Sequence, residues 1–181
     1  RKNWENLDII FGYKLEDRLL DEFQNNSIEL IYSSHCFEHI AFKNLPKIFG
    51  SIYEKLAPGG TFRIVVPDID KLWSIYSSDE KKNYKFYRGY YKENFSIKDL
   101  MLLLYGFSED KKYFLQNSMH LSFFSENSLK LLLSKCGFKK FNKFSFGDSN
   151  VDDFKITQEQ TNDGFDNPDS RDISLYLEVS K

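Results

Sequence analysis

The sequence is poor in the features that mark secreted, membrane-bound and nucleic-acid-binding proteins. It contains only two cysteines, a hundred positions apart and without the spacing of a metal site, so we expect reduced thiols in a cytoplasmic protein. Basic and acidic side chains nearly balance at a net charge of −2, which gives no reason to expect nucleic acid or an anionic membrane as a partner. No apolar run approaches the ~20 residues of a membrane-spanning helix, and the first residues show no signal-peptide core.

Apolar patterns predict a single α/β domain over residues 1–181. Apolar runs indicate strands, several of them nearly continuous and therefore covered on both faces, at 6–11, 13–15, 28–33, 62–66, 141–146 and 173–179. Apolar residues at helical spacing predict helices at 45–56, 96–106 and 125–138, with Asn44, Ser96 and Ser125 as N-caps. The polar segment 148–171 is expected to be a surface loop. This alternation predicts a doubly wound sheet with helices on both faces.

The stretch HCFEH, residues 35–39, has the H-x-x-E-H spacing of an inverted zinc-protease helix. In such a helix His35 and His39 would share a face, but a hydrolase also needs a third ligand and an open coordination position. The nearest acidic residue in a suitable place, Glu109, falls in a predicted turn, and His120 is the only other histidine. We therefore expect no metal ion, and zinc hydrolysis ranks third among the interpretations of this sequence.

The same stretch belongs to an ordered series of motifs. The chain contains WENLDI, then SIELIYSSHCFEHI, an amphipathic helix, LAPGGTFRIVVPD, HLSFFSENSLKLLLSKCGF and finally SLYLEVSK. In this order the motifs resemble class I S-adenosylmethionine-dependent methyltransferases. They are most similar to the type-11-like bacterial branch often found with genes for cell-surface polysaccharide and lipopolysaccharide. The resemblance covers nearly the whole chain, and it implies a Rossmann-like sheet with S-adenosylmethionine as the cofactor.

The resemblance also implies where the cofactor binds, because ligands of open α/β sheets lie beyond the carboxyl ends of the strands. Asp8 ends the strand NLDI, where a carboxylate would accept hydrogen bonds from the ribose hydroxyls. Asp17, or alternatively Glu16, lies where the family often places an acidic residue near the adenine amino group. The end of the next strand, 33–35, would pass under the methionine part. The predicted cofactor-binding set is Asp8, Ile9, Asp17, Ser33, Ser34 and His35.

Two histidines are the predicted proton acceptors of the reaction. A hydroxyl acceptor loses its proton during methyl transfer, and a neutral histidine near pH 7 can take it. His35 is a candidate because it lies at the rim of the expected site. His120 is the other, because the family often brings its segment over the acceptor, although a structural role is equally compatible with the sequence. Glu38 and His39 are interpreted as scaffold residues that begin the following helix.

The aromatic-rich segment after the strand at 62–66, within residues 68–118, is predicted to be a helical insert on the acceptor side. Aromatic faces interleaved with lysine and arginine suit sugars and phosphates, so the expected acceptor is a small molecule or a carbohydrate. The sequence leaves two alternatives open. The insert could pack on the body of the domain, or it could form a contact in a homodimer.

One element of the family pattern is missing from the sequence. The Gly-rich loop that should follow the first strand is absent, and the first glycine is Gly12. We expect this strand and its loop to lie upstream of Arg1 and to fill a slot between the strands at 7–11 and 28–33, because buried strand edges without partners are costly. The alternative is a rearranged pairing of these edges within the chain. The alternative function from another class is a methyltransferase-like scaffold protein without activity.

Overall fold

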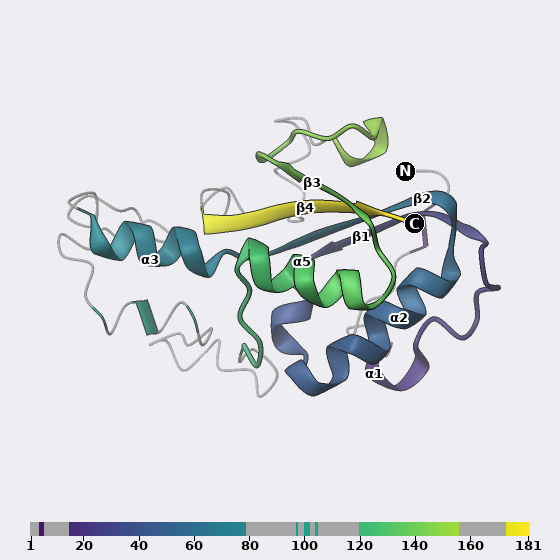
Figure 1. Cartoon of the computed structure of the whole chain (residues 1–181), viewed down its shortest axis with the longest axis horizontal. Helices are drawn as coiled ribbons and strands as arrows, with labels where there is room; N and C mark the ends of the chain where they lie inside the picture. The colour runs from purple at the N-terminus through teal and green to yellow at the C-terminus, as the bar shows by residue number, and fades with distance from the viewer. Residues whose placement is uncertain are drawn as a thin grey trace.

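A four-stranded mixed sheet organises the chain, as the computed structural model in Figure 1 shows. The structure describes residues 4–5, 15–78, 97, 100–101, 104, 120–155 and 173–181. In spatial order the strands are β1 (Ile28–Ser34), β2 (Leu56–Pro67), β4 (Ser174–Ser180) and β3 (Lys140–Phe144). Strand β1 runs parallel to β2, and β4 is antiparallel to both of its neighbours. The predicted α/β class is therefore confirmed.

Seven helices with defined bounds accompany the sheet in the described residues, besides the helical positions 97, 100, 101 and 104. The α-helices are α1 (Leu15–Arg18), α2 (Leu45–Lys55), α3 (Ile69–Ser77) and α5 (Glu126–Lys135). The 3₁₀ helices are η2 (Phe37–His39), η3 (Phe42–Asn44) and η7 (Asp152–Phe154). Within these segments, no helix combines the length and the apolar character that crossing a bilayer requires.

The helix α2 and the strand β2 form the connection that was predicted, with two differences of detail. Asn44 stands at the N-cap position as predicted, but it has helical backbone angles and its side chain makes no capping hydrogen bond. The strand begins at Leu56, directly after the helix and earlier than the predicted start at 62, and residues 57–60 form a bulge between the paired residues Leu56 and Thr61. Gly60 fits this bulge because a Cβ there would lie 3.0 Å from the carbonyl oxygens of two β1 residues.

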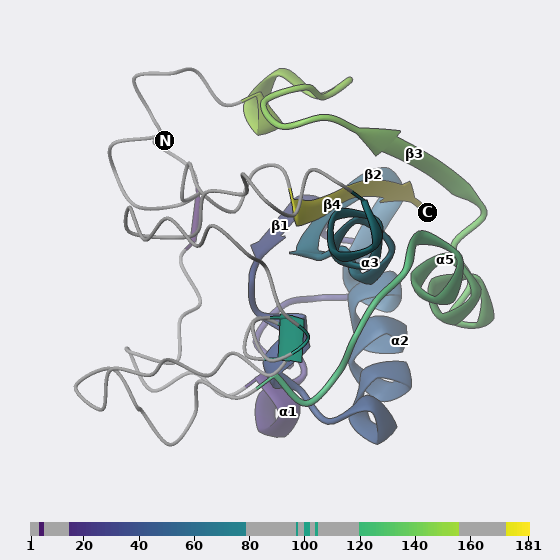
Figure 2. The ribbon, with the colours of Figure 1, turned by 90° about the vertical axis from the view of Figure 1, so that its left-hand side faces the viewer.

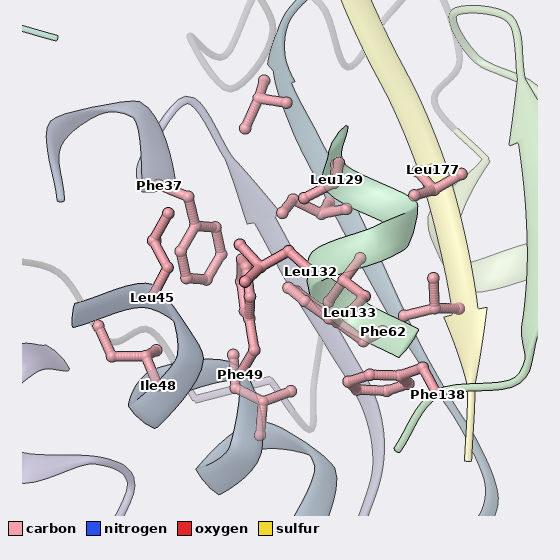
Figure 3. Packing of buried hydrophobic residues seen from close by; sticks show 14 of the residues in the cluster. Phe37, Leu45, Ile48, Phe49, Phe62, Leu129, Leu132, Leu133, Phe138 and Leu177 are labelled. Atoms are coloured by element: carbon pink, nitrogen blue, oxygen red, sulfur yellow. The ribbon is translucent and has the colours of Figure 1, made fainter. Parts of the chain in front are cut away.

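The main core fills the space between the sheet and one layer of helices (Figure 3). Residues of alternate positions on β2 and β4, such as Phe62 and Leu177, point into it, as the two-residue period of a strand requires. Phe49 of α2 and Leu133 of α5 meet them from the helical side, and both are fully buried. Two helices that are distant in sequence therefore cover the same face of the sheet.

The opposite face of the sheet is closed differently from the prediction. In the described part of the chain it is covered by residues 144–154 and not by a long helix: Phe154 is buried, and its ring lies 6.1 Å from that of Tyr32 on β1. The start of the segment predicted as a surface loop is thus part of the packing. Under it, Arg63 of β2 and Glu178 of β4 form a buried ion pair at 2.6 Å. Among the described residues, the only helix on this face is the short 3₁₀ helix η7, and no α-helix covers it.

Helix α5 has the capping that its sequence predicts. The Ser125 hydroxyl accepts a hydrogen bond from the Ser128 amide at 3.1 Å, and the Ser128 hydroxyl accepts one from the Ser125 amide at 2.9 Å. At the other end, Gly137 has a left-handed backbone with φ +111°, and the Phe138 amide donates to the Leu133 carbonyl. Such closure satisfies backbone groups that a helix end otherwise leaves without partners.

We expect Ser125→Ala to lower the free energy of unfolding by about 1 kcal/mol, because the Ser128 amide loses the hydroxyl that accepts its hydrogen bond. Ser134→Ala, an exposed serine of the same helix, is the matched control and should change stability much less. Urea unfolding followed by circular dichroism measures both. Equal effects of the two substitutions would contradict the role given to the cap.

Several predictions fall partly or wholly outside the described residues. These are the strand at 6–11, residues 13–14 of the short strand, most of the insert at 68–118, and the slot between 7–11 and 28–33. Leu15 itself begins α1, so the short strand does not reach it. Of the helix predicted at 96–106, residues 97, 100, 101 and 104 are described and helical; Leu100 is buried, whereas Ile97 and Met101 are exposed.

Candidate active site

The candidate site lies at one edge of the sheet, where β1 and β2 end and β4 begins. His35 follows the last residue of β1, Asp68 follows β2, and Ser174 opens β4. Figure 2 views the molecule from the side on which α3 continues from β2. Because β1 and β2 are parallel, both present their carboxyl ends here, and this is the edge at which open α/β sheets bind ligands.

His35 is held rigidly at this edge. Its amide donates to the Val65 carbonyl at 2.9 Å, and its backbone is left-handed with φ +47°. Its Nδ1 lies 3.0 Å from Oε1 of Glu38, and its Nε2 lies 3.1 Å from the hydroxyl of Ser174. A carboxylate only accepts, so Nδ1–H donates to Glu38 and Nε2 of the neutral ring accepts from the serine. Both ring nitrogens of His35 are thus engaged.

This arrangement of serine, histidine and glutamate has the connectivity of a hydrolase triad, but its geometry excludes that chemistry. The nucleophile of a triad must reach a substrate carbonyl. Ser174 has no exposed surface. The helix required by the H-x-x-E-H interpretation is missing as well, because only residues 37–39 are helical, as 3₁₀, and His35 stands outside with left-handed backbone angles. The expectation that His35 and His39 share a helical face is wrong.

A second cluster lies next to the first and is formed by Glu38, His39 and His120. One ligand-type atom from each residue lies within 4.8 Å of the others, and the two imidazole rings have centroids 4.9 Å apart. Nδ1 of His120 donates to the Leu104 carbonyl at 2.8 Å, which leaves Nε2 of the neutral ring with its lone pair. Burial lowers the pKa of His120, while the Glu38 charge opposes the shift.

Hydrogen bonds hold the two segments of this cluster together. The carbonyl of Glu38 accepts from the amides of Leu121 at 2.6 Å and Ser122 at 3.0 Å. The Ser122 hydroxyl donates to the Ile40 carbonyl at 2.6 Å. His120 is therefore placed beside the start of the segment that follows β1.

The structure brings together some of the predicted cofactor-binding residues and not others. Ser33, Ser34 and His35 are consecutive at the end of β1 and lie at the expected edge. Asp17 is exposed on α1. The residue after this helix, Leu19, is tied to α2, because its carbonyl accepts a hydrogen bond from the Ser51 hydroxyl. Asp8 and Ile9 lie outside the described residues. The roles of these six residues stay predictions.

Sequence reasoning did not foresee that Glu38 and His39 belong to one cluster with His120. The dipeptide Glu38-His39 after a buried strand and the histidine before an expected helix start are visible in the sequence. Nothing in their spacing, 81 positions between the two histidines, shows that they touch. Only the pairing of the chain at Glu38, Leu121 and Ser122 reveals this.

Comparison with known proteins identifies the family. A family model described as a methyltransferase domain matches residues 9–142, about three quarters of the chain. The chain therefore belongs to this family of methyltransferase domains.

Individual relatives cover the chain only in part or at low identity. Phosphoethanolamine N-methyltransferase 2 of Caenorhabditis elegans is 31% identical over 90 residues, which are 50% of this chain and 20% of that protein. A SAM-dependent methyltransferase from Archaeoglobus fulgidus has a TM-score of 0.48 at 14% identity, covering 93% of this chain and 65% of the other. Phosphoethanolamine N-methyltransferase 2 of Haemonchus contortus, solved with S-adenosyl-L-methionine, has a TM-score of 0.41 at 16% identity, covering 88% and 34%. The chain thus spans less than two thirds of each of these proteins.

Proposed function

We propose that this protein transfers a methyl group from S-adenosylmethionine to a small-molecule or carbohydrate acceptor. The observation that carries the proposal is the match to the methyltransferase-domain family over residues 9–142. The sheet edge supports it, since the residues predicted at the methionine end of the cofactor follow β1 at its carboxyl end. We further propose that the reaction belongs to surface-polysaccharide biosynthesis, and this part of the proposal rests on the sequence motifs alone.

The donor groups at this edge fit S-adenosylmethionine. The half-buried hydroxyls of Ser33 and Ser34, with their strand-end backbone groups, suit the amino and carboxyl groups of a methionine moiety. We propose Asp8 for the ribose hydroxyls and Asp17, or alternatively Glu16, for the adenine. S-adenosylmethionine supplies an activated methyl group when bound, and the task left to the chain is to hold and orient the acceptor.

The acceptor is proposed to lie beside α3, which starts at the carboxyl end of β2. Asp68 is buried there and caps α3 by accepting from the Asp70 amide at 3.1 Å. Trp73 is 58% exposed, and its ring centroid lies 5.6 Å from that of Tyr76. An exposed tryptophan beside a half-buried tyrosine on a capped helix suits the apolar face of a sugar ring.

The two histidines predicted as proton acceptors differ in whether a ring nitrogen is available to accept a proton. Both nitrogens of His35 are engaged, by Glu38 and by the buried Ser174. His120 keeps Nε2 after Nδ1 has donated to the Leu104 carbonyl. We therefore propose that His120 serves the acceptor side of the site and that His35 mainly organises the end of β1.

Transfer of labelled methyl from S-adenosylmethionine tests the proposed function. The acceptor panel should contain nucleotide sugars, sugar phosphates and phosphoethanolamine, since one relative is named for the last of these. We expect label in one of these acceptors with the full-length protein. Binding of the cofactor without transfer to any acceptor in the panel would narrow the acceptor class; absence of both would favour the scaffold alternative.

A further inference from the structure

We propose that Glu38, His39 and His120 form a binding site for one divalent transition-metal ion, with zinc as the working probe. The sequence predicts no metal, and the pair that its spacing suggests, His35 with His39, is not the pair proposed here. The site is a different set, assembled from two segments of the chain.

The carboxylate of Glu38 provides the first observation. The residue is only 1% exposed. Its Oε1 accepts from Nδ1 of His35, but its Oε2 is buried and has no hydrogen-bond partner among the described residues. A buried carboxylate oxygen without a partner is costly, because it has given up water and gained nothing in exchange. A cation beside Oε2 would remove this cost.

The histidines supply the second observation. Ligand-type atoms of His39 and His120 lie within 4.8 Å of each other and of the Glu38 carboxylate, a separation that one ion at ~2.0–2.2 Å from each ligand can bridge after small side-chain movements. The bond from His120 Nδ1 to the Leu104 carbonyl fixes the tautomer that leaves Nε2 as a ligand. Metal-binding histidines commonly donate their second nitrogen to a carbonyl or carboxylate in this way.

The frame around the cluster is preorganised. The Glu38 carbonyl binds the amides of Leu121 and Ser122, and the Ser122 hydroxyl binds the Ile40 carbonyl. His39 and His120 are therefore fixed next to each other by backbone hydrogen bonds that do not depend on an ion. Ligands held in place before the ion arrives lose less conformational freedom on binding it.

Two imidazole nitrogens and one carboxylate oxygen favour a borderline ion such as Zn²⁺ over Mg²⁺ or Ca²⁺, which prefer oxygen ligands. Three protein ligands leave a coordination position open. If the proposed methyl transfer holds, an acceptor hydroxyl at that position would bind the ion and release its proton to solvent more easily. With the ion bound, Nε2 of His120 is a ligand and does not accept that proton. This role rests on the proposed function; the binding of the ion does not.

The test is a titration of the full-length protein, first stripped with a chelator, with Zn²⁺ by calorimetry and with Co²⁺ by visible absorption. We expect one ion per chain, and a cobalt spectrum typical of low coordination number with nitrogen ligands. His39→Ala and His120→Ala should each weaken binding by more than about 100-fold, since removal of even an outer partner costs about 10–100-fold. Glu38→Gln should weaken it comparably.

Glu29→Gln is the matched control for Glu38→Gln, because Glu29 is an exposed glutamate near the opposite end of β1 and is given no part in the cluster. It should retain the ion. Circular dichroism confirms that each variant is folded. If an alanine variant is not folded, the glutamine variant at the same position, His39→Gln or His120→Gln, replaces it. No stoichiometric ion in the native protein, or an affinity that folded His39 and His120 variants leave unchanged, would overturn the proposal. Because the experiment measures metal binding and not methyl transfer, the metal site can be refuted without refuting the proposed function. The proposed function can likewise be refuted without refuting the metal site.

Discussion

Glu178→Ala is expected to lower the free energy of unfolding by about 3–5 kcal/mol, the cost of removing one partner of a buried ion pair. Arg63 has no exposed surface, and its Nη1 donates to Oε1 of Glu178 at 2.6 Å and to the Asp148 carbonyl at 2.9 Å. The same Glu178 oxygen accepts from the Ser149 hydroxyl. Without Glu178 the guanidinium would be a buried charge with no counter-ion among the described residues.

A domain of this size has only ~5–15 kcal/mol of total stability, so the loss should be obvious in urea or thermal unfolding. Glu29→Ala is the control, because Glu29 is an exposed glutamate on strand β1 of the same sheet. The double variant Arg63→Met, Glu178→Leu should recover most of the loss, since apolar replacement of a whole buried pair is often tolerated. A single variant as stable as the native protein would contradict the account of this face of the sheet.

Asp8→Ala should weaken the binding of S-adenosylmethionine by about 1.5–3 kcal/mol, the range for a hydrogen bond to a charged group. The reason is the proposed bond from its carboxylate to the ribose hydroxyls. Folding should be nearly unaffected. Calorimetric titration of native protein and variant measures the difference directly.

Asp21→Ala is a matched control for Asp8, since Asp21 is an exposed aspartate that is given no part in the site. It should bind the cofactor as the native protein does. An Asp8→Ala variant that is folded and keeps its full affinity would remove Asp8 from the site and leave the ribose contact to another residue.

The elements with strong local patterns could be predicted from the sequence. The apolar run at 28–33 is β1, and the periodic leucines before Gly137 form α5 with Ser125 as its cap. In these cases the signal is short-range, because strand and helix periods and capping residues act within a few positions. The family resemblance added the order of the elements, and the family match supports its coarse form.

The elements that depend on distant partners could not be predicted. HCFEH has the spacing of a helical metal motif, yet pairing of His35 with Val65, Glu38 and Ser174 holds its first histidine outside any helix. Phe154 lies in a polar segment that the sequence predicts to be a surface loop, but its ring packs against Tyr32 and covers the sheet. Tertiary contacts decide both outcomes, and a local pattern carries no information about them.

The most direct test of the central claim is a calorimetric titration of the full-length protein with S-adenosylmethionine and with its demethylated product, S-adenosylhomocysteine. The account predicts that each ligand binds one site per chain and that the two compete, because adenine, ribose and the amino-acid part are common to both. Competition between the cofactor and its product would indicate that both occupy the same site, as expected for a methyltransferase and not for incidental binding of a nucleoside. A folded protein that binds neither ligand would contradict the account and leave a methyltransferase-like fold without its cofactor.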